Sequence, residues 1–106
     1  MGRVAKMAEV RPYREFPFLI AFKATSMESR SEATRWLKAR GAVHVLADVW
    51  FLKAQYLFAE DISHEFERSG LFHGKLFVVK LHQASDWSRR ALSEEADSWI
   101  SKNLAS

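Results

Sequence analysis

The residue types that carry most acid–base, nucleophilic and metal chemistry are few in this chain and are scattered along it. There is no cysteine, and the four histidines are His44, His64, His73 and His82. No two of them have the H-x-x-x-H spacing that places both imidazoles on one helix face, and no acidic residue joins them in a known ligand pattern. No serine lies in a G-x-S-x-G elbow, and the glycines are isolated rather than grouped into a phosphate-binding loop. We therefore predict no catalytic residue, no metal site and no cofactor.

The sharpest chemical feature is a lysine at the end of an apolar run. Residues 16–23 read FPFLIAFK, with apolar side chains at both alternating positions, as in an interior strand that is covered on both faces. The last of these residues, Lys23, stands where ligand and catalytic groups of α/β sheets gather. With Arg11, Arg14 and Arg30 it could form a basic patch that contacts nucleic-acid phosphates without reading sequence, the alternative being a solvated rim.

Composition limits the classes of protein to which this chain can belong. With 106 residues, of which 48% are hydrophobic and 27% charged, it has the make-up of one globular domain with a modest core. No apolar run approaches the ~20 residues that cross a bilayer, and the lack of cysteine fits a reducing cytoplasm. Residues 1–40 hold nine Lys and Arg against four Asp and Glu, a basic half that suits a polyanionic partner. We expect a tail over residues 1–15, a single domain over residues 16–106, a cytoplasmic location and no membrane contact.

Hydrophobic spacing and capping residues predict the elements that must position these side chains. Ser29 and Glu32 fit a capping box before an apolar helical stripe, and Gly41 suits the left-handed position that follows the helix. Ser93 opens a final helix with two glutamates behind it, and two strands meet near Asp48 as a hairpin. The predicted order is strand 16–23, helix 29–40, strands 42–47 and 49–54, helix 59–69, strand 75–81 and helix 93–104.

This order predicts an α+β fold, a ferredoxin-like βαββαβ plait with an added C-terminal helix. Two helices cover one face of its four-stranded sheet and cannot cover both. We expect the second face to be apolar as well, through Leu19 and Ala21 on the first strand and Leu76 and Val78 on the last. A second copy of the chain, or the terminal helix folded back, should cover that face, and we expect a homodimer.

The four tryptophans separate into two groups. Three fall on apolar stripes and are expected in the core, namely Trp36, Trp50 and Trp99. Trp87 lies in a polar segment with Arg89 and Arg90 and has no such stripe around it. Because Trp and Arg dominate binding hot spots, these three residues are candidates for an interface, an ordinary docked loop being the other reading.

The order and spacing of the predicted elements also match a known pattern. Besides the apolar first strand and the helix that ends at Gly41, the segments that carry the likeness are Val45-Leu46, Val49–Leu52, Glu60-Asp61-Ile62, Lys75–Val79 and Leu92–Leu104. Over about residues 18–104 the chain resembles the small CRISPR-associated integration-scaffold proteins and their VapD-like and SinR-like relatives.

The resemblance implies a ferredoxin-like homodimer, and it points to a missing ligand. In the nuclease members the first strand ends in tyrosine-aspartate, and two such aspartates across the dimer hold a divalent metal. The matching positions here are Phe22 and Lys23. Because hard cations need oxygen ligands, an ammonium at that position would repel the metal rather than bind it.

The function that these observations favour is that of a non-catalytic homodimeric binding module, a degenerate relative of that family. Its partner would be another protein, a nucleic acid backbone, or both. One alternative is a metal-dependent endonuclease of the toxin type that uses other residues. A second is a small defence-related or mobile-element protein that acts by occluding a partner.

Overall fold

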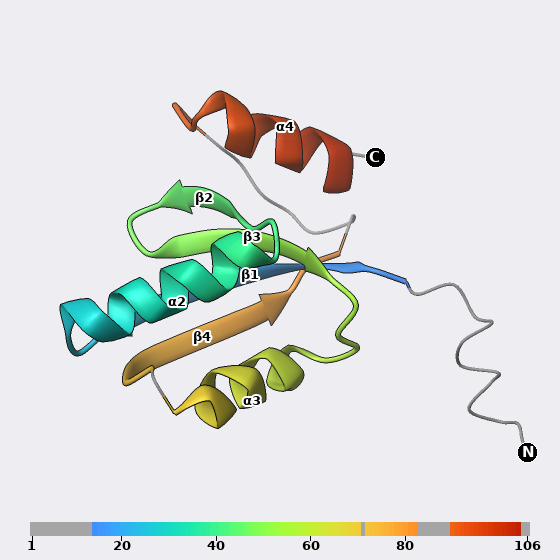
Figure 1. Cartoon of the computed structure of the whole chain (residues 1–106). Helices are drawn as coiled ribbons and strands as arrows, with labels where there is room; N and C mark the ends of the chain where they lie inside the picture. The colour runs from blue at the N-terminus through green and yellow to red at the C-terminus, as the bar shows by residue number, and fades with distance from the viewer. Residues whose placement is uncertain (1–13, 71, 83–89, 105–106) are drawn as a thin grey trace, which may run out of the picture.

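The computed structural model describes residues 14–70, 72–82 and 90–104. They form one four-stranded antiparallel sheet, in the order β2-β3-β1-β4, and three helices (Figure 1). The elements along the chain are β1 (Phe16–Ala24), α2 (Met27–Ala39), β2 (Val43–Leu46), β3 (Val49–Ala54), α3 (Ala59–Ser69), β4 (Gly74–Lys80) and α4 (Glu94–Asn103).

The predicted α+β fold is confirmed. The first six elements follow the order βαββαβ, and the strands that precede the two crossover helices, β1 and β3, lie in the middle of the sheet. This is the arrangement of a ferredoxin-like plait, with α4 as the added C-terminal helix. In the part of the chain that the structure describes, no helix combines the length and the apolar character needed to cross a bilayer.

The main core lies between the sheet and the helices α2 and α3. Phe18, Ile20 and Phe22 point to that side of β1 and are buried, because alternate residues of a strand share one face. They pack against Leu37 of α2 and Phe66 of α3, among other residues. The interior position of β1 agrees with its sequence, since apolar side chains on both faces are typical of an interior strand that is covered twice.

The first turn of α2 differs from the predicted capping box. The helix begins at Met27, and its N-cap is Ser26, whose hydroxyl oxygen accepts a hydrogen bond from the Ser29 amide at 3.1 Å. Ser29 itself is buried, and its hydroxyl oxygen accepts a hydrogen bond from the amide of His73 at 3.0 Å. The serine that resembled a cap therefore ties α2 to the segment between α3 and β4. The predicted left-handed Gly41 is confirmed, with φ of 77°.

The terminal helix α4 covers part of the second sheet face, which is one of the two covers expected. The helix begins one residue after the predicted start, and Ser93 is its N-cap, because the Ser93 hydroxyl oxygen accepts a hydrogen bond from the Ala96 amide at 3.1 Å. Trp99 stacks on Phe51 of β3, with ring centroids 4.4 Å apart and planes 9° apart. A second core cluster forms there, and it contains Val43, Phe51, Ala96, Trp99, Ile100 and Leu104.

The prediction that Leu76 and Val78 lie on the second face is wrong. The register pairs Ile20 with Val78 and Phe22 with Leu76, and residues paired in this way share a face. Leu76 and Val78 accordingly pack against the main core on the side of α2 and α3. Both sets of alternate residues in β4 are apolar, so the sequence could not indicate which set faces the helices.

Truncating Trp99 tests whether α4 belongs to the folded core. We expect Trp99→Ala to lower the free energy of unfolding by about 3–5 kcal/mol, because it removes a buried ring from a stacked pair. Urea denaturation followed by circular dichroism measures this change. Leu57→Ala is the control, since Leu57 is 53% exposed and its truncation should change stability by less than about 0.5 kcal/mol. A loss below 1 kcal/mol for Trp99→Ala would show that α4 is not part of the cooperative core.

Candidate functional site

The end of β1 presents two lysines side by side. Lys23 lies opposite Lys75 of β4 in the sheet register, and both residues are exposed. Like charges at directly opposed positions repel each other, so the two ammonium groups favour an anionic neighbour between or above them. Both residues belong to the alternate set that includes Ala21, so they border the second sheet face rather than the main core.

A glycine fixes the backbone at this point. Gly74, the first residue of β4, has a φ of 152°, and it pairs with Ala24 in the register. A Cβ at Gly74 would overlap the carbonyl oxygen of Lys23 and lie 2.8 Å from the Cα of Ala24. The close approach of β4 to the end of β1, which brings the two lysines together, therefore requires glycine at this position.

The structure does not bring the other predicted basic residues to Lys23. Arg14 precedes β1 and lies at the opposite end of that strand, where its guanidinium carbon is 5.3 Å from the centre of the Phe16 ring. Arg30 lies on α2, on the other side of the sheet, and its Nε donates to Asp48 Oδ1 at 2.9 Å. Arg11 lies outside the described residues. The single basic patch expected from sequence is thus divided among different surfaces.

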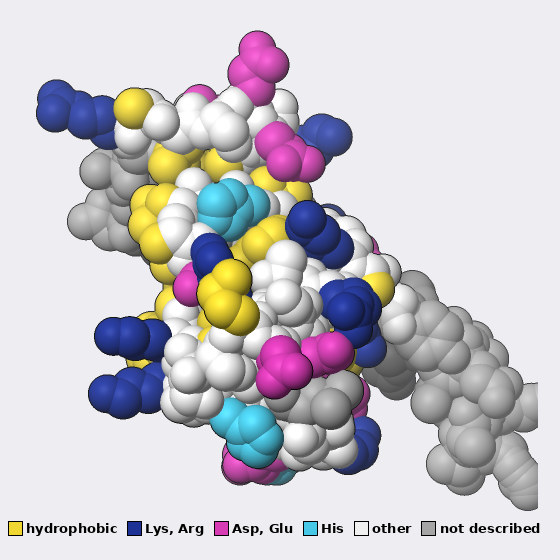
Figure 2. Space-filling view, turned by 60° about the vertical axis from the view of Figure 1, so that its left-hand side comes forward, with side chains coloured by type: hydrophobic (Ala, Val, Ile, Leu, Met, Phe, Trp, Pro, Cys, Tyr) yellow, Lys and Arg dark blue, Asp and Glu magenta, His cyan; other side chains and the backbone are white. Residues whose placement is uncertain are grey.

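An open apolar area remains on the second sheet face beside the lysines. Phe77 is 62% exposed, and its register partner Ala21 and the neighbouring Val79 are only partly buried. None of these three residues belongs to the cluster under α4. We call Ala21, Phe77 and Val79, with Lys23 and Lys75 at their end, the open sheet face. Figure 2 views the molecule from the end where β1 stops and β4 begins, and lysine and arginine side chains stand out around its rim.

The remaining predicted interface residues have different positions. Leu19 packs against the cluster under α4 and is partly buried there, within its own chain. Arg90 is exposed and precedes α4. Trp87 and Arg89 lie outside the described residues. Sequence reasoning missed Phe77, although its alternation with Lys75 and Val79 was a usable signal for a surface strand with an apolar centre.

The histidines lie on separate elements. His44 Nε2 is 2.6 Å from the carbonyl oxygen of Ala47, and His64 is 3.5 Å from Glu60 on the exposed side of α3. His73 is exposed, and its carbonyl oxygen accepts hydrogen bonds from the amide and the hydroxyl of Thr25. Across residues 14–70, 72–82 and 90–104, no group of three or more His, Asp or Glu side chains could hold a metal ion.

Comparisons with protein-family models, with curated proteins and with solved structures find no significant match.

Substitution of Gly74 tests the backbone contact that positions the two lysines. We expect Gly74→Ala to lower the free energy of unfolding by about 2–5 kcal/mol, because the new Cβ combines backbone strain with steric overlap. The matched control is Gly41→Ala, where φ is also positive but no atom lies within 4 Å of the added Cβ. That control should cost about 1 kcal/mol in denaturant unfolding. Equal losses for the two variants would show that the contact with Lys23 is not tight.

Proposed function

We propose that the protein is a non-catalytic binding module that works as a homodimer, with the open sheet face as its dimer contact. The observation that carries this proposal is Phe77, a large apolar side chain 62% exposed at the centre of an apolar strip. Contiguous apolar surface with charged residues at its edge is characteristic of association sites. This role agrees with what the resemblance implies, a degenerate relative of a dimeric nuclease family.

The shape of the second face supports a second copy as the occupant. Helix α4 packs over the side of the face formed by β2 and β3, whereas Phe77 of β4 is exposed, so among the described residues the face has a raised half and an open half. Figure 1 shows α4 beside β2, on the far side of the sheet from β4. Rotation about a two-fold axis parallel to the strands exchanges the raised and the open halves. Each α4 would then lie over the open sheet face of the other copy, which gives a closed, isologous contact.

Charge supports the same arrangement. Helix α4 begins at the end of the sheet where β1 stops and β4 starts (Figure 1). Its first turn carries the exposed residues Glu94 and Glu95. The two-fold rotation keeps that end of the molecule in place, so these acids would approach Lys23 and Lys75 of the other copy. Exposed pairs of this kind contribute about 0–1 kcal/mol each, so they orient the contact while apolar burial drives it.

The non-catalytic part of the proposal rests on Lys23. In the resemblance this residue occupies the position of the metal-binding aspartate, and its ammonium group repels a divalent cation. A dimer would leave α2 and α3, with Arg30 and Arg35, available to a further partner. That partner would be a protein or a nucleic acid backbone.

The dimer contact can be tested by adding a charge to its centre. We expect the wild type to be dimeric at tens of micromolar in sedimentation equilibrium, a working concentration at which specific homodimers form. Phe77→Asp should be monomeric there, because a carboxylate would be buried in an apolar contact. Phe58→Asp is the matched control, since Phe58 is 61% exposed but lies at the start of α3, on the other side of the sheet. A monomeric wild type, or a Phe77→Asp variant that stays dimeric, would contradict the proposal.

An endonuclease that uses other residues is the second candidate. The observation in its favour is the exposed residue His73. Its carbonyl oxygen accepts hydrogen bonds from Thr25, which lies two residues beyond Lys23. Under our proposal, purified protein should not cleave RNA or DNA with Mg²⁺ or with Mn²⁺. Cleavage that depends on metal and is lost in His73→Ala, but not in the exposed control His64→Ala, would establish the nuclease instead.

A further inference from the structure

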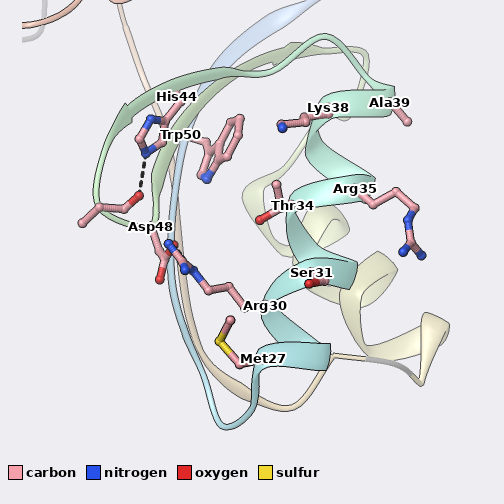
Figure 3. A pocket seen from close by; sticks show the side chains of 11 residues that line it. Met27, Arg30, Ser31, Thr34, Arg35, Lys38, Ala39, His44, Asp48 and Trp50 are labelled. Carbon is pink, nitrogen blue, oxygen red and sulfur yellow. Dashed lines mark hydrogen bonds and ion pairs between the residues drawn. The ribbon is translucent and has the colours of Figure 1, made fainter.

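A groove lies on the opposite side of the sheet from the open sheet face, between α2 and the hairpin of β2 and β3. It has a volume of about 860 Å³ and is open to solvent along its length. Figure 3 shows its lining residues, which come from one stripe of α2 and from the two hairpin strands with their turn.

The wall formed by α2 is polar and cationic. Residues spaced three and four apart share one helix face, and here Arg30, Ser31, Thr34, Arg35 and Lys38 follow that spacing. The apolar stripe of the same helix, which includes Leu37, faces the main core instead. In Figure 3 the side chains of Thr34 and Lys38 point from the helix toward the hairpin, across the groove. This wall therefore offers hydroxyl and ammonium donors to a bound molecule.

The acceptors at the hairpin end of the groove are already engaged. Asp48 Oδ1 accepts a hydrogen bond from Arg30 Nε at 2.9 Å, and the carbonyl oxygen of Ala47 lies 2.6 Å from His44 Nε2. Of the four ionised side chains in the lining, only Asp48 is anionic, against Arg30, Arg35 and Lys38. Within the described part of the chain, the Lys38 ammonium makes no ion pair. Because Arg30 is paired with Asp48 and Arg35 with Glu32, the Lys38 ammonium is, among the described residues, the uncompensated charge of the groove.

Trp50 supplies an independent sign of a ligand. Its side chain forms part of the groove wall beside His44, with the two rings 5.0 Å apart, and the residue is 6% exposed. Its indole Nε1 is buried and has no hydrogen-bond partner among the described residues. A buried donor without an acceptor is uncommon, because burial removes its hydrogen bond to water. In Figure 3 this nitrogen points toward the space between Thr34 and the pair of Arg30 and Asp48.

From these observations we propose that the groove binds a phosphate group, with the Thr34 hydroxyl and the Lys38 ammonium as its first donors. The Trp50 indole N–H, which is buried in the absence of ligand, becomes the third donor when the bound phosphate displaces the side chains that cover it. A phosphate presents several acceptor oxygens and negative charge, which matches a set of donors that converge from two walls. A carboxylate has two oxygens in one plane and would satisfy fewer of them. The open length of the groove leaves room for an organic group attached to the phosphate, as in a phosphomonoester.

This site does not depend on the proposed dimer. The donors lie on the face that carries α2, whereas the dimer contact lies on the face that carries α4. The dimer contact could be absent and the groove still bind phosphate, or the reverse, and each experiment reports on one of them alone.

Nuclear magnetic resonance of the indole protons tests the proposal directly. The full chain has four tryptophans, and Trp50→Phe identifies the Trp50 indole signal by its disappearance. Inorganic phosphate and adenosine 5′-monophosphate are titrated separately at constant ionic strength, with acetate as the competing anion. We expect saturable movement of the Trp50 indole proton with phosphate or with the monophosphate, and at least tenfold weaker binding in Lys38→Gln and Thr34→Val.

The controls separate a built site from general attraction of anions. Lys102→Gln removes the same charge from the end of α4, outside the groove lining, and should leave binding within twofold of the wild type. Tighter binding of the monophosphate than of inorganic phosphate would identify a phosphomonoester as the ligand class, and the reverse order would identify the free ion. No movement of the Trp50 signal with either probe would overturn the proposal. An equal response to acetate, or equal weakening by Lys102→Gln, would overturn it as well.

Discussion

The structure depends on one constraint, which is that β1 carries apolar side chains toward both faces of the sheet. Such a strand must be covered twice. On one side, α2 and α3 bury Phe18 and Ile20 completely. On the other side, α4 reaches Leu19 but not Ala21, because the helix packs mainly over β2 and β3. The raised and open halves of the second face, the exposure of Phe77 and the two lysines beside it all follow from this incomplete cover.

Local signals in the sequence were sufficient for the elements and for the fold class. Ser93 caps α4, because its hydroxyl oxygen accepts a hydrogen bond from a backbone amide of that helix. Gly70 ends α3 in the left-handed conformation, with φ of 69°. Both features depend only on residues that are close in the sequence. For β4, local signals were not sufficient. Alternation separates Leu76 from Phe77 but does not say which of the two meets the helices, and only the pairing of β4 with β1 decides it. Ser29 was wrongly predicted to be a helix cap for a related reason. Its hydroxyl accepts a hydrogen bond from His73, which is 44 residues away in the sequence.

In the candidate sites, local sequence signals likewise did not determine which charged and polar groups come together. Lys23 and Arg30 are close in sequence, yet they lie on opposite sides of the sheet, because a strand and the helix after it belong to different layers. Lys23 and Lys75 are far apart in sequence and become neighbours through the register. The groove beside α2 also combines distant segments. Trp50 of β3, whose indole N–H is unpaired among the described residues, and the polar stripe of α2 that includes Lys38 line the same groove. The sequence identified Trp50 as a core residue, which is correct, but it could not show that its polar atom faces a groove.

The two faces of the sheet therefore offer different chemistry to partners. The open sheet face is apolar with charge only at its end, and such a surface gains free energy mainly by excluding water from a complementary protein surface. The groove is the opposite case, because its donors are held in place and gain from a ligand with acceptors and negative charge. A two-fold dimer through the open sheet face would leave both grooves on its outer surfaces. Self-association and ligand binding would then occupy separate faces, joined by β1 and β3 at the centre of the sheet. Trp50 and Phe51 are adjacent residues of β3, and their side chains belong to the two different cores on the two sides of the sheet.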